Sequence, residues 1–300
     1  MDFPQTKLQE LWDRTEVQAG TLYVVGTPIG NAGDISLRAL ATLAKADTVL
    51  AEDTRTSAEL LSPFGIKPFY LSFHDHNYAG RIPQVLELLT GGNSVAQISD
   101  AGMPGVSDPG AELVDACLEA GIPVKVVPGP SASTAIISLS GLDSSDFRFI
   151  GFIPIKEKDR QSCFESIRNY AGLNIIYEAP HRLVETLEAM AEAGFGQRRL
   201  VVGRELTKRY EEVFRDTLDN VIDHFRQVKP RGEFVLVLDQ ASELELKEAH
   251  AEAVDNLETV IRARLQAGAS QKTIVQELNE NISLSKNELK KLIQSISQED

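Results

Sequence analysis

The chain has 300 residues, 42% of them hydrophobic and 25% charged, so it has the composition of a globular protein and enough length for two ordinary domains. Its formal net charge of −14 argues against a protein that coats nucleic acid nonspecifically, although it does not exclude RNA as a substrate. We expect neither a membrane span nor a signal peptide, and Cys117 and Cys163, which lack CxxC spacing, indicate reduced thiols in the cytosol.

Residues 1–19 are predicted to form a polar, partly helical extension, after which strands alternate with helices. Runs of β-branched and other apolar residues predict strands at 21–26, 47–53, 67–77, 93–99 and 122–127. Apolar spacings of three and four predict helices at 37–46, 54–65, 82–90 and 110–120, with another starting near Ser131. The alternation predicts an α/β domain over 20–132, with a mostly parallel sheet that carries helices on both faces.

A second α/β domain is predicted over 133–240, because apolar runs at 147–154, 174–178, 199–205 and 233–239 suggest a mixed sheet with more antiparallel character. Helices are expected between these runs at 160–170, 184–192 and 218–226. Residues 241–300 are predicted to form a helical appendage of three short helices at 256–266, 270–280 and 285–295. Ser270 and Ser285 have the character of N-caps, and Ser285 begins a capping-box pattern. A helix-turn-helix-like module and a plain packing module both remain open.

Three clusters rich in Gly, Pro and Asp, at 26–34, 99–110 and 128–133, each follow a predicted strand of the first sheet. Ligands of such sheets bind outside the carboxyl ends of the strands, so we expect the three loops to form one cleft. Gly102 would let the backbone approach a ligand, and free N–H groups near Ser131 could meet a carboxylate or carbonyl. The plainer alternatives are turns and helix caps, and the cap or turn is the favoured interpretation for Asp108.

Acidic and basic side chains also gather at three predicted strand ends. His74 and His76 would share one strand face, but the sequence suggests no third ligand nearby, so no metal site is predicted. The stretches at 52–55 and 178–182 combine acids with Arg or His, and local ion pairs or caps explain them equally well. These patterns predict a two-domain α/β protein with a loop-walled cleft, but they do not identify a reaction.

Several ordered motifs together resemble the small-subunit ribosomal RNA methyltransferase I family of the tetrapyrrole methylase superfamily. They include VVGTPIGN, LAEDTR, SDAGMPGVSDPG, VPGPSA, YEAPHRL, RELTK and GEFVLV, between Gly20 and Asp239. The resemblance implies a two-domain tetrapyrrole-methylase-like fold that holds S-adenosylmethionine in the cleft between the domains. It also implies methylation of the ribose 2′-hydroxyl of a cytidine in 16S rRNA, within the small ribosomal subunit, by a cytoplasmic homodimer that needs no metal.

The resemblance further implies a set of residues that contact the cofactor. These are Pro28, Asp100, Gly102, Met103, Val106, Ser131, Ala132 and Tyr177. The chain departs from the family pattern at Met103, where threonine is typical, at Gly105 and Val106, where bulkier aliphatic residues are usual, and at Tyr78, where glutamate is common.

A ribose hydroxyl is a poor nucleophile, so a proton acceptor would assist its methylation. Strand-end position and family motif make Glu178, Asp53 and His181 the candidates for this catalytic role. The candidates for contacts with the RNA substrate are Arg55, His74, Asn77, Arg182, Arg204 and Lys208.

Two other functions are compatible with the sequence. One is a methyltransferase of the same superfamily with a small-molecule substrate, against which the AEDTR and YEAPHR stretches speak. The other is a ribosome-assembly or binding factor that keeps the cleft without catalysis, which the acidic net charge and the departures at Met103 and Tyr78 favour.

Overall fold

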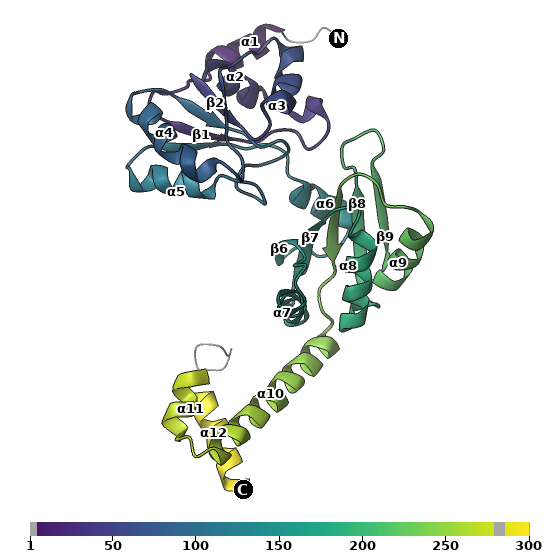
Figure 1. Cartoon of the computed structure of the whole chain (residues 1–300). Helices are drawn as coiled ribbons and strands as arrows, with labels where there is room; N and C mark the ends of the chain where they lie inside the picture. The colour runs from purple at the N-terminus through teal and green to yellow at the C-terminus, as the bar shows by residue number, and fades with distance from the viewer. Residues whose placement is uncertain (1–4, 279–285, 300) are drawn as a thin grey trace. The chain divides into compact units, whose positions relative to one another are not determined.

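A computed structural model describes residues 5–278 and 286–299 of the chain (Figure 1). Its contacts divide the chain into two units, Met1–Ile153 with Asn174–Leu238, and Pro154–Leu173 with Asp239–Asp300. Both sheets fall in the first unit, whereas the sequence suggests boundaries at 20–132, 133–240 and 241–300. Those boundaries stay a prediction about folding units.

The first sheet, which was predicted to be mostly parallel, is parallel throughout and has the strand order β3-β2-β4-β1-β5. Its strands are β1 (Leu22–Val25), β2 (Thr48–Ala51), β3 (Tyr70–Ser72), β4 (Val95–Gln97) and β5 (Val124–Val127). Its helices are α1 (Gln5–Asp13), α2 (Leu37–Lys45), α3 (Thr54–Leu61), α4 (Tyr78–Thr90) and α5 (Ala111–Glu119), with 3-10 turns η1 (Ala32–Asp34) and η2 (Ser62–Phe64). Because every strand runs the same way, their carboxyl ends share one edge of the sheet.

Apolar clusters on both faces of this sheet explain its stability. One cluster joins Leu40 and Leu43 of α2 and Leu61 of α3 to the sheet. The other joins Leu89 of α4 and Cys117 of α5 to the opposite face. Burial raises the pKa of the Cys117 thiol to about 11, so this cysteine behaves as a core residue.

The strand predicted at 67–77 ends earlier in the structure, at Ser72. The backbone N–H of His74 donates to Asn77 Oδ1 at 2.9 Å, which closes a turn, and α4 then begins at Tyr78 instead of Ile82. The prediction that His74 and His76 share a strand face is therefore wrong. The polar side chain of Asn77 ends the strand by offering the backbone a local partner.

The second sheet has the order β6-β7-β10-β8-β9, in which β10 pairs antiparallel with β7 and β8, and β8 with β9. Its strands are β6 (Phe147–Phe152), β7 (Leu173–Glu178), β8 (Arg199–Arg204), β9 (Glu212–Thr217) and β10 (Phe234–Leu238). The elements that accompany it are α6 (Ala132–Ser140), α8 (Leu183–Met190), η3 (Ala191–Phe195) and α9 (Leu218–Gln227). Strand β9 was not predicted, because this exposed edge strand is largely polar.

The second unit is helical and contains α7 (Glu157–Arg168), α10 (Glu243–Gln266), α11 (Gln271–Leu278) and α12 (Lys286–Glu299). Helix α10 starts well before the predicted Asn256, because Ser242 and Glu245 form a capping box there. Ser270 accepts a hydrogen bond from Thr273 N at 3.2 Å, which confirms it as a cap, whereas Ser285 lies outside the described residues. Among the helices described, none is long and apolar enough to cross a membrane.

Candidate functional site

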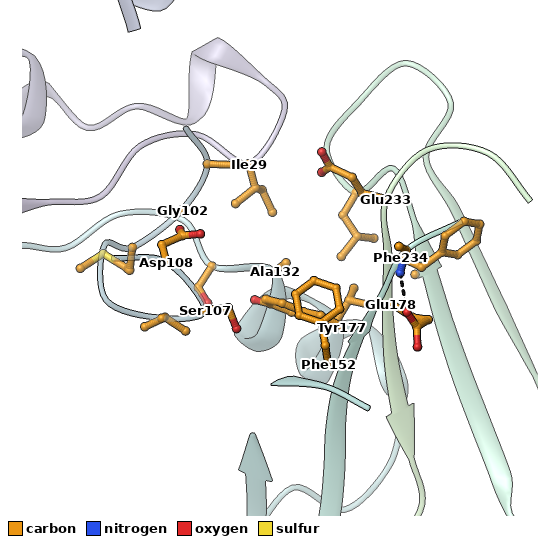
Figure 2. A pocket seen from close by; sticks show the side chains of 18 of the residues that line it. Ile29, Gly102, Ser107, Asp108, Ala132, Phe152, Tyr177, Glu178, Glu233 and Phe234 are labelled. Atoms are coloured by element: carbon orange, nitrogen blue, oxygen red, sulfur yellow. Dashed lines mark hydrogen bonds between the residues drawn. The ribbon is translucent and has the colours of Figure 1, made fainter. Parts of the chain in front are cut away.

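A cavity of about 370 Å³ lies within the first unit, where the carboxyl edge of the first sheet faces the second sheet (Figure 2). This volume is within the range of small-molecule sites. One side is lined by Ile29, Ala101, Gly102, Met103, Val106, Ser107, Asp108, Ser131 and Ala132. The other is lined by Phe152, Tyr177, Glu178, Ala179, Pro180, Gly203, Leu206, Glu233, Phe234 and Val235.

The loops after β1 and β4 are held together by their backbones. Thr27 N donates to Gly102 O at 2.8 Å, and Gly102 N donates to Thr27 O at 3.2 Å. The Thr27 hydroxyl adds a bond to Ser99 O at 3.1 Å. Gly102 has φ +84° and Ser107 has φ +61°, so this stretch keeps a conformation that ordinary residues rarely adopt. These hydrogen bonds fix the loops after β1 and β4 as one wall of the cavity, where the sequence predicts a cleft.

The loop after β5 packs against the end of β1 without any intervening side chain. A Cβ built on Gly26 would lie 2.6 Å from Gly129 Cα and also 2.6 Å from Met103 Sδ. Glycine is therefore required at this crossing of two backbones. Met103, one of the departures noted in the sequence, places its thioether beside Gly26.

The cavity carries an acidic group, Asp108, on its first-sheet side. Burial, followed by the nearby charges of Asp100 and Asp75, raises the pKa of Asp108, while a hydrogen bond from Ser99 acts in the opposite direction. Burial also raises the pKa of Glu52, and the nearby negative charge of Asp108 is the second cause. Helix α5 begins after Gly110, so Asp108 precedes the cap position by two residues and the interpretation as a helix cap is wrong. The arrangement creates a negative potential that favours a cationic ligand.

Six of the eight expected cofactor residues line the cavity, namely Gly102, Met103, Val106, Ser131, Ala132 and Tyr177. The other two are their neighbours: Pro28 is buried beside the lining residue Ile29, and Asp100 precedes Ala101 and accepts a hydrogen bond from Asp53 N at 3.2 Å. Sequence reasoning missed Phe152, Leu206 and Glu233. Leu206 lies within the RELTK motif and Glu233 within the GEFVLV motif, and Phe152 ends β6, so these motifs and strand-end positions were the available signals.

Glu178, a candidate proton acceptor, is buried and fully hydrogen-bonded. Its Oε2 accepts from the Thr186 hydroxyl at 2.6 Å, its Oε1 accepts from Ala179 N at 2.8 Å, and Arg182 Nη2 lies 3.8 Å from Oε2. Neighbouring strand residues face opposite ways, and Figure 2 shows the Glu178 side chain pointing away from the Tyr177 ring. This carboxylate therefore holds the end of β7 against α8, a positioning role.

Asp53 also has a local task, since its Oδ1 accepts from Arg55 N at 2.8 Å at the start of α3. The side-chain and backbone hydrogen bonds from Arg55 lower the pKa of Asp53 to about 2, which makes it a weak base. His181 is exposed and directly follows Pro180, which lines the cavity. Among the contacts described, His181 has neither the ion pair of Asp53 nor the carboxylate hydrogen bonds of Glu178, so it stays the candidate proton acceptor.

None of the six candidate RNA contacts is among the residues that line the cavity, and most of them have partners in the chain. Lys208 Nζ lies 3.0 Å from both Glu205 Oε1 and Glu233 Oε2. Arg204 Nε donates to Arg231 O at 2.8 Å, and Arg182 Nη2 donates to Ile153 O at 2.8 Å. His74 and Asn77 share the turn before α4, and Arg55 pairs with Asp53 at 3.0 Å. Their contact with RNA stays a prediction.

Comparison with known proteins identifies the family. The model of the tetrapyrrole (corrin/porphyrin) methylases matches residues 21–222. The ribosomal RNA small subunit methyltransferase I of Synechocystis sp. is 41% identical over 273 residues, which cover 91% of this chain and 97% of that protein. The protein of the same name from Thermotoga maritima is 45% identical over 219 residues, which cover 73% of this chain and 98% of that protein. The chain belongs to the ribosomal RNA small subunit methyltransferase I family, within the tetrapyrrole methylases.

Solved structures agree with this membership at the level of the fold. Diphthine synthase superposes with a TM-score of 0.59 at 19% identity, over 77% of this chain and 94% of that one. The uroporphyrin-III C-methyltransferase of Thermus thermophilus, in complex with S-adenosylhomocysteine, gives a TM-score of 0.52 at 19% identity, over 73% of this chain and 96% of that one. The tetrapyrrole methylase fold expected from the sequence is confirmed.

The residues present fit S-adenosylmethionine, the cofactor of this family. Gly102 lines the cavity without a side chain, and Tyr177 and Phe152 provide apolar aromatic surface on the other side. Asp108 supplies a negative charge that suits the positively charged sulfonium. Size, shape and charge of the cavity are therefore consistent with this cofactor.

Proposed function

We propose that the chain is an S-adenosylmethionine-dependent methyltransferase that modifies the ribose 2′-hydroxyl of a cytidine in 16S rRNA. The observation that carries this proposal is that the loops expected to hold the cofactor line one cavity, in a chain whose relatives bear the name ribosomal RNA small subunit methyltransferase I. S-adenosylmethionine supplies a methyl group that is already activated for displacement by its bond to a sulfonium. The task left to the protein is to bind, to orient and to accept a proton.

Each part of the cavity has a place in this task. The loops around Gly102 and Ser131 would hold the cofactor, and Asp108 would favour its charged form. His181 would accept the proton that the ribose hydroxyl releases, while Glu178 fixes the strand end that precedes it. Arg55, His74, Asn77, Arg182, Arg204 and Lys208 remain proposed RNA contacts. We further propose that the chain acts in the cytoplasm as a homodimer, as the family resemblance implies. We also propose that its substrate is the assembled small subunit, because an acidic chain gains little binding energy from naked RNA.

The test is to incubate the chain with labelled S-adenosylmethionine and either small ribosomal subunits or free 16S rRNA from a strain that lacks this modification, and then to map 2′-O-methylated residues. A single methylated cytidine ribose, formed faster in the subunit, supports the proposal. Cofactor binding without transfer would favour a non-catalytic factor. Equal or faster modification of the free rRNA would remove the preference for the assembled subunit.

Replacing His181 with alanine is expected to lower kcat at least about 100-fold, because general base catalysis typically contributes that much, and to leave cofactor affinity unchanged. Single-turnover rates at saturating cofactor and calorimetric Kd values measure the two effects separately. His76→Ala is the matched control, since His76 is an exposed histidine in the turn before α4. A normal kcat in His181→Ala would refute the assignment.

Asp108→Asn is expected to weaken S-adenosylmethionine binding about five-fold, with less than about a two-fold effect on S-adenosylhomocysteine, which lacks the sulfonium charge. The exposed residue Asp115 on α5 gives the charge-matched control Asp115→Asn.

Burial raises the pKa of Asp108. Its carboxyl group is ionised above that pKa and loses its attraction for the sulfonium as the pH falls through it. Wild-type affinity for S-adenosylmethionine should therefore decline toward acid pH, and Asp108→Asn should flatten the decline, with Glu52 supplying the remainder. Equal losses for both ligands would contradict this role.

A further inference from the structure

The edge strand β6 presents aromatic side chains to solvent beside the cavity. Phe147 is 48% exposed, Phe149 37% and Phe152 50%, although the second sheet has a buried core available. Exposed apolar groups gathered on one strand commonly mark a binding surface. Two of them, Phe149 and Phe152, pack with Tyr177 of β7 into what we call the aromatic ledge.

The ledge depends on an irregularity in β6. Residues 149 and 152 are three apart, so a regular strand would turn them to opposite faces. Gly151 between them has φ +75°, which breaks the alternation. Both rings consequently meet Tyr177 edge to face, with centroids 4.8 Å apart for Phe149 and 6.1 Å apart for Phe152.

The aromatic ledge is continuous with the cavity. Phe152 and Tyr177 line it, and a Cβ built on Gly151 would lie 3.7 Å from the Ser107 hydroxyl on the loop after β4. Figure 2 shows the side chains of Phe152 and Tyr177 beside one another, with Ser107 on one side of them and Glu178 on the other. A molecule that reached from the ledge toward Gly102 would therefore pass directly over the cavity.

We propose that the aromatic ledge stacks the base of the nucleotide whose ribose is methylated, an inference that rests on the function proposed above. The base is attached to C1′, next to the carbon that carries the reacting hydroxyl, so it must lie within one sugar ring of the transferred methyl group. Single-stranded RNA bases are commonly held by stacking on aromatic side chains. Stacking does not require a basic surface, which explains how a chain with a net charge of −14 can hold RNA at its active site. A second copy of this chain is the other occupant that such a strand could have.

The test compares Phe149→Leu, Phe152→Leu and Phe149→Trp with the wild type in the methylation assay. Each stacked base is worth at least about five-fold in affinity, so both leucine variants should raise the KM for the RNA substrate about ten-fold. The Kd for S-adenosylmethionine should stay within about two-fold in Phe149→Leu, because Phe149 is not among the residues that line the cavity. Phe149→Trp should keep a near-normal KM because it preserves the stacking surface. Phe69→Leu is the control. Phe69 is also an exposed phenylalanine, at 69%, but it precedes β3, an edge strand of the first sheet, and does not line the cavity.

Three results would overturn the inference. An unchanged KM for RNA in both leucine variants would show that no base stacks there, and a loss of cofactor affinity in Phe149→Leu would assign the rings to the cofactor. Sedimentation that shows a wild-type dimer converted to monomer by Phe149→Leu would assign the strand to a second copy. If the wild type methylates no rRNA, both the proposed function and the stacking role of the aromatic ledge are wrong. If the wild type methylates rRNA and the leucine variants have the same KM for RNA, only the stacking role is wrong.

Discussion

Replacing Gly102 with valine is expected to weaken S-adenosylmethionine binding at least about ten-fold. Gly102 has φ +84°, a conformation that costs a β-branched residue roughly 1–2 kcal/mol. A Cβ at this position would lie 3.5 Å from Ile29 Cγ2 and 3.6 Å from Pro130 O, which is ordinary contact. The two further methyl groups of valine therefore have to enter the cavity or displace its wall. Calorimetry with S-adenosylmethionine measures the loss directly.

The control for this prediction separates backbone strain from obstruction of the cavity. Gly65 has φ +71° with nothing within 4 Å of its Cβ position, and it ends η2 away from the cavity lining. Gly65→Val should therefore lose stability while keeping its affinity for the cofactor. If Gly102→Val bound the cofactor as the wild type does, the loop after β4 would not form the cofactor wall.

The second large effect is expected at the contact between Gly26 and Gly129. An alanine at position 26 would put its Cβ 2.6 Å from Gly129 N and Cα, and these are backbone atoms that cannot move alone. We expect Gly26→Ala to reduce the free energy of unfolding by about 3 kcal/mol, at the upper end of the cost of overpacking, and to displace the cofactor loops as well. Urea denaturation followed by fluorescence and circular dichroism gives the change in stability.

Gly80 provides the matched control for Gly26. It lies inside α4, has nothing within 4 Å of its Cβ position, and takes no part in the cavity. Alanine is the better helix former, so Gly80→Ala should stabilise the protein by about 0.5–1 kcal/mol. If the free energy of unfolding falls in Gly26→Ala and rises in Gly80→Ala, the contacts around each Cβ position determine how the substitution affects stability. A Gly26→Ala protein as stable as the wild type would mean that the two loops are not packed as described.

Much of the fold could be predicted because its strands are short apolar runs with loops rich in Gly and Pro. The three loops after β1, β4 and β5 could be placed together, since parallel strands present their carboxyl ends at one edge. Strand β9 could not be found in the same way, because half-exposed edge strands need not carry an apolar pattern. The start of α10 is marked by the capping box at Ser242, a signal that apolar spacing alone does not contain.

The site itself was only partly predictable, for reasons that particular residues make clear. Tyr177 and Glu178 are neighbours on β7 and both border the cavity, but their side chains point opposite ways, and the Glu178 carboxylate is hydrogen-bonded to Ala179 and Thr186. Asp108 looked like a cap because it precedes a helix, but its burial depends on contacts with distant segments. The pairing of Phe149 and Phe152 depended on the backbone angle of Gly151, which the sequence alone does not reveal.

The cavity between the two sheets is expected to bind the methyl donor. A crystal structure of the chain with S-adenosylhomocysteine tests this most directly. We predict that the ligand lies between the loop at Gly102 and the ring of Tyr177, with Asp108 nearby. A ligand bound elsewhere, with this cavity empty at saturating concentration, would contradict the account.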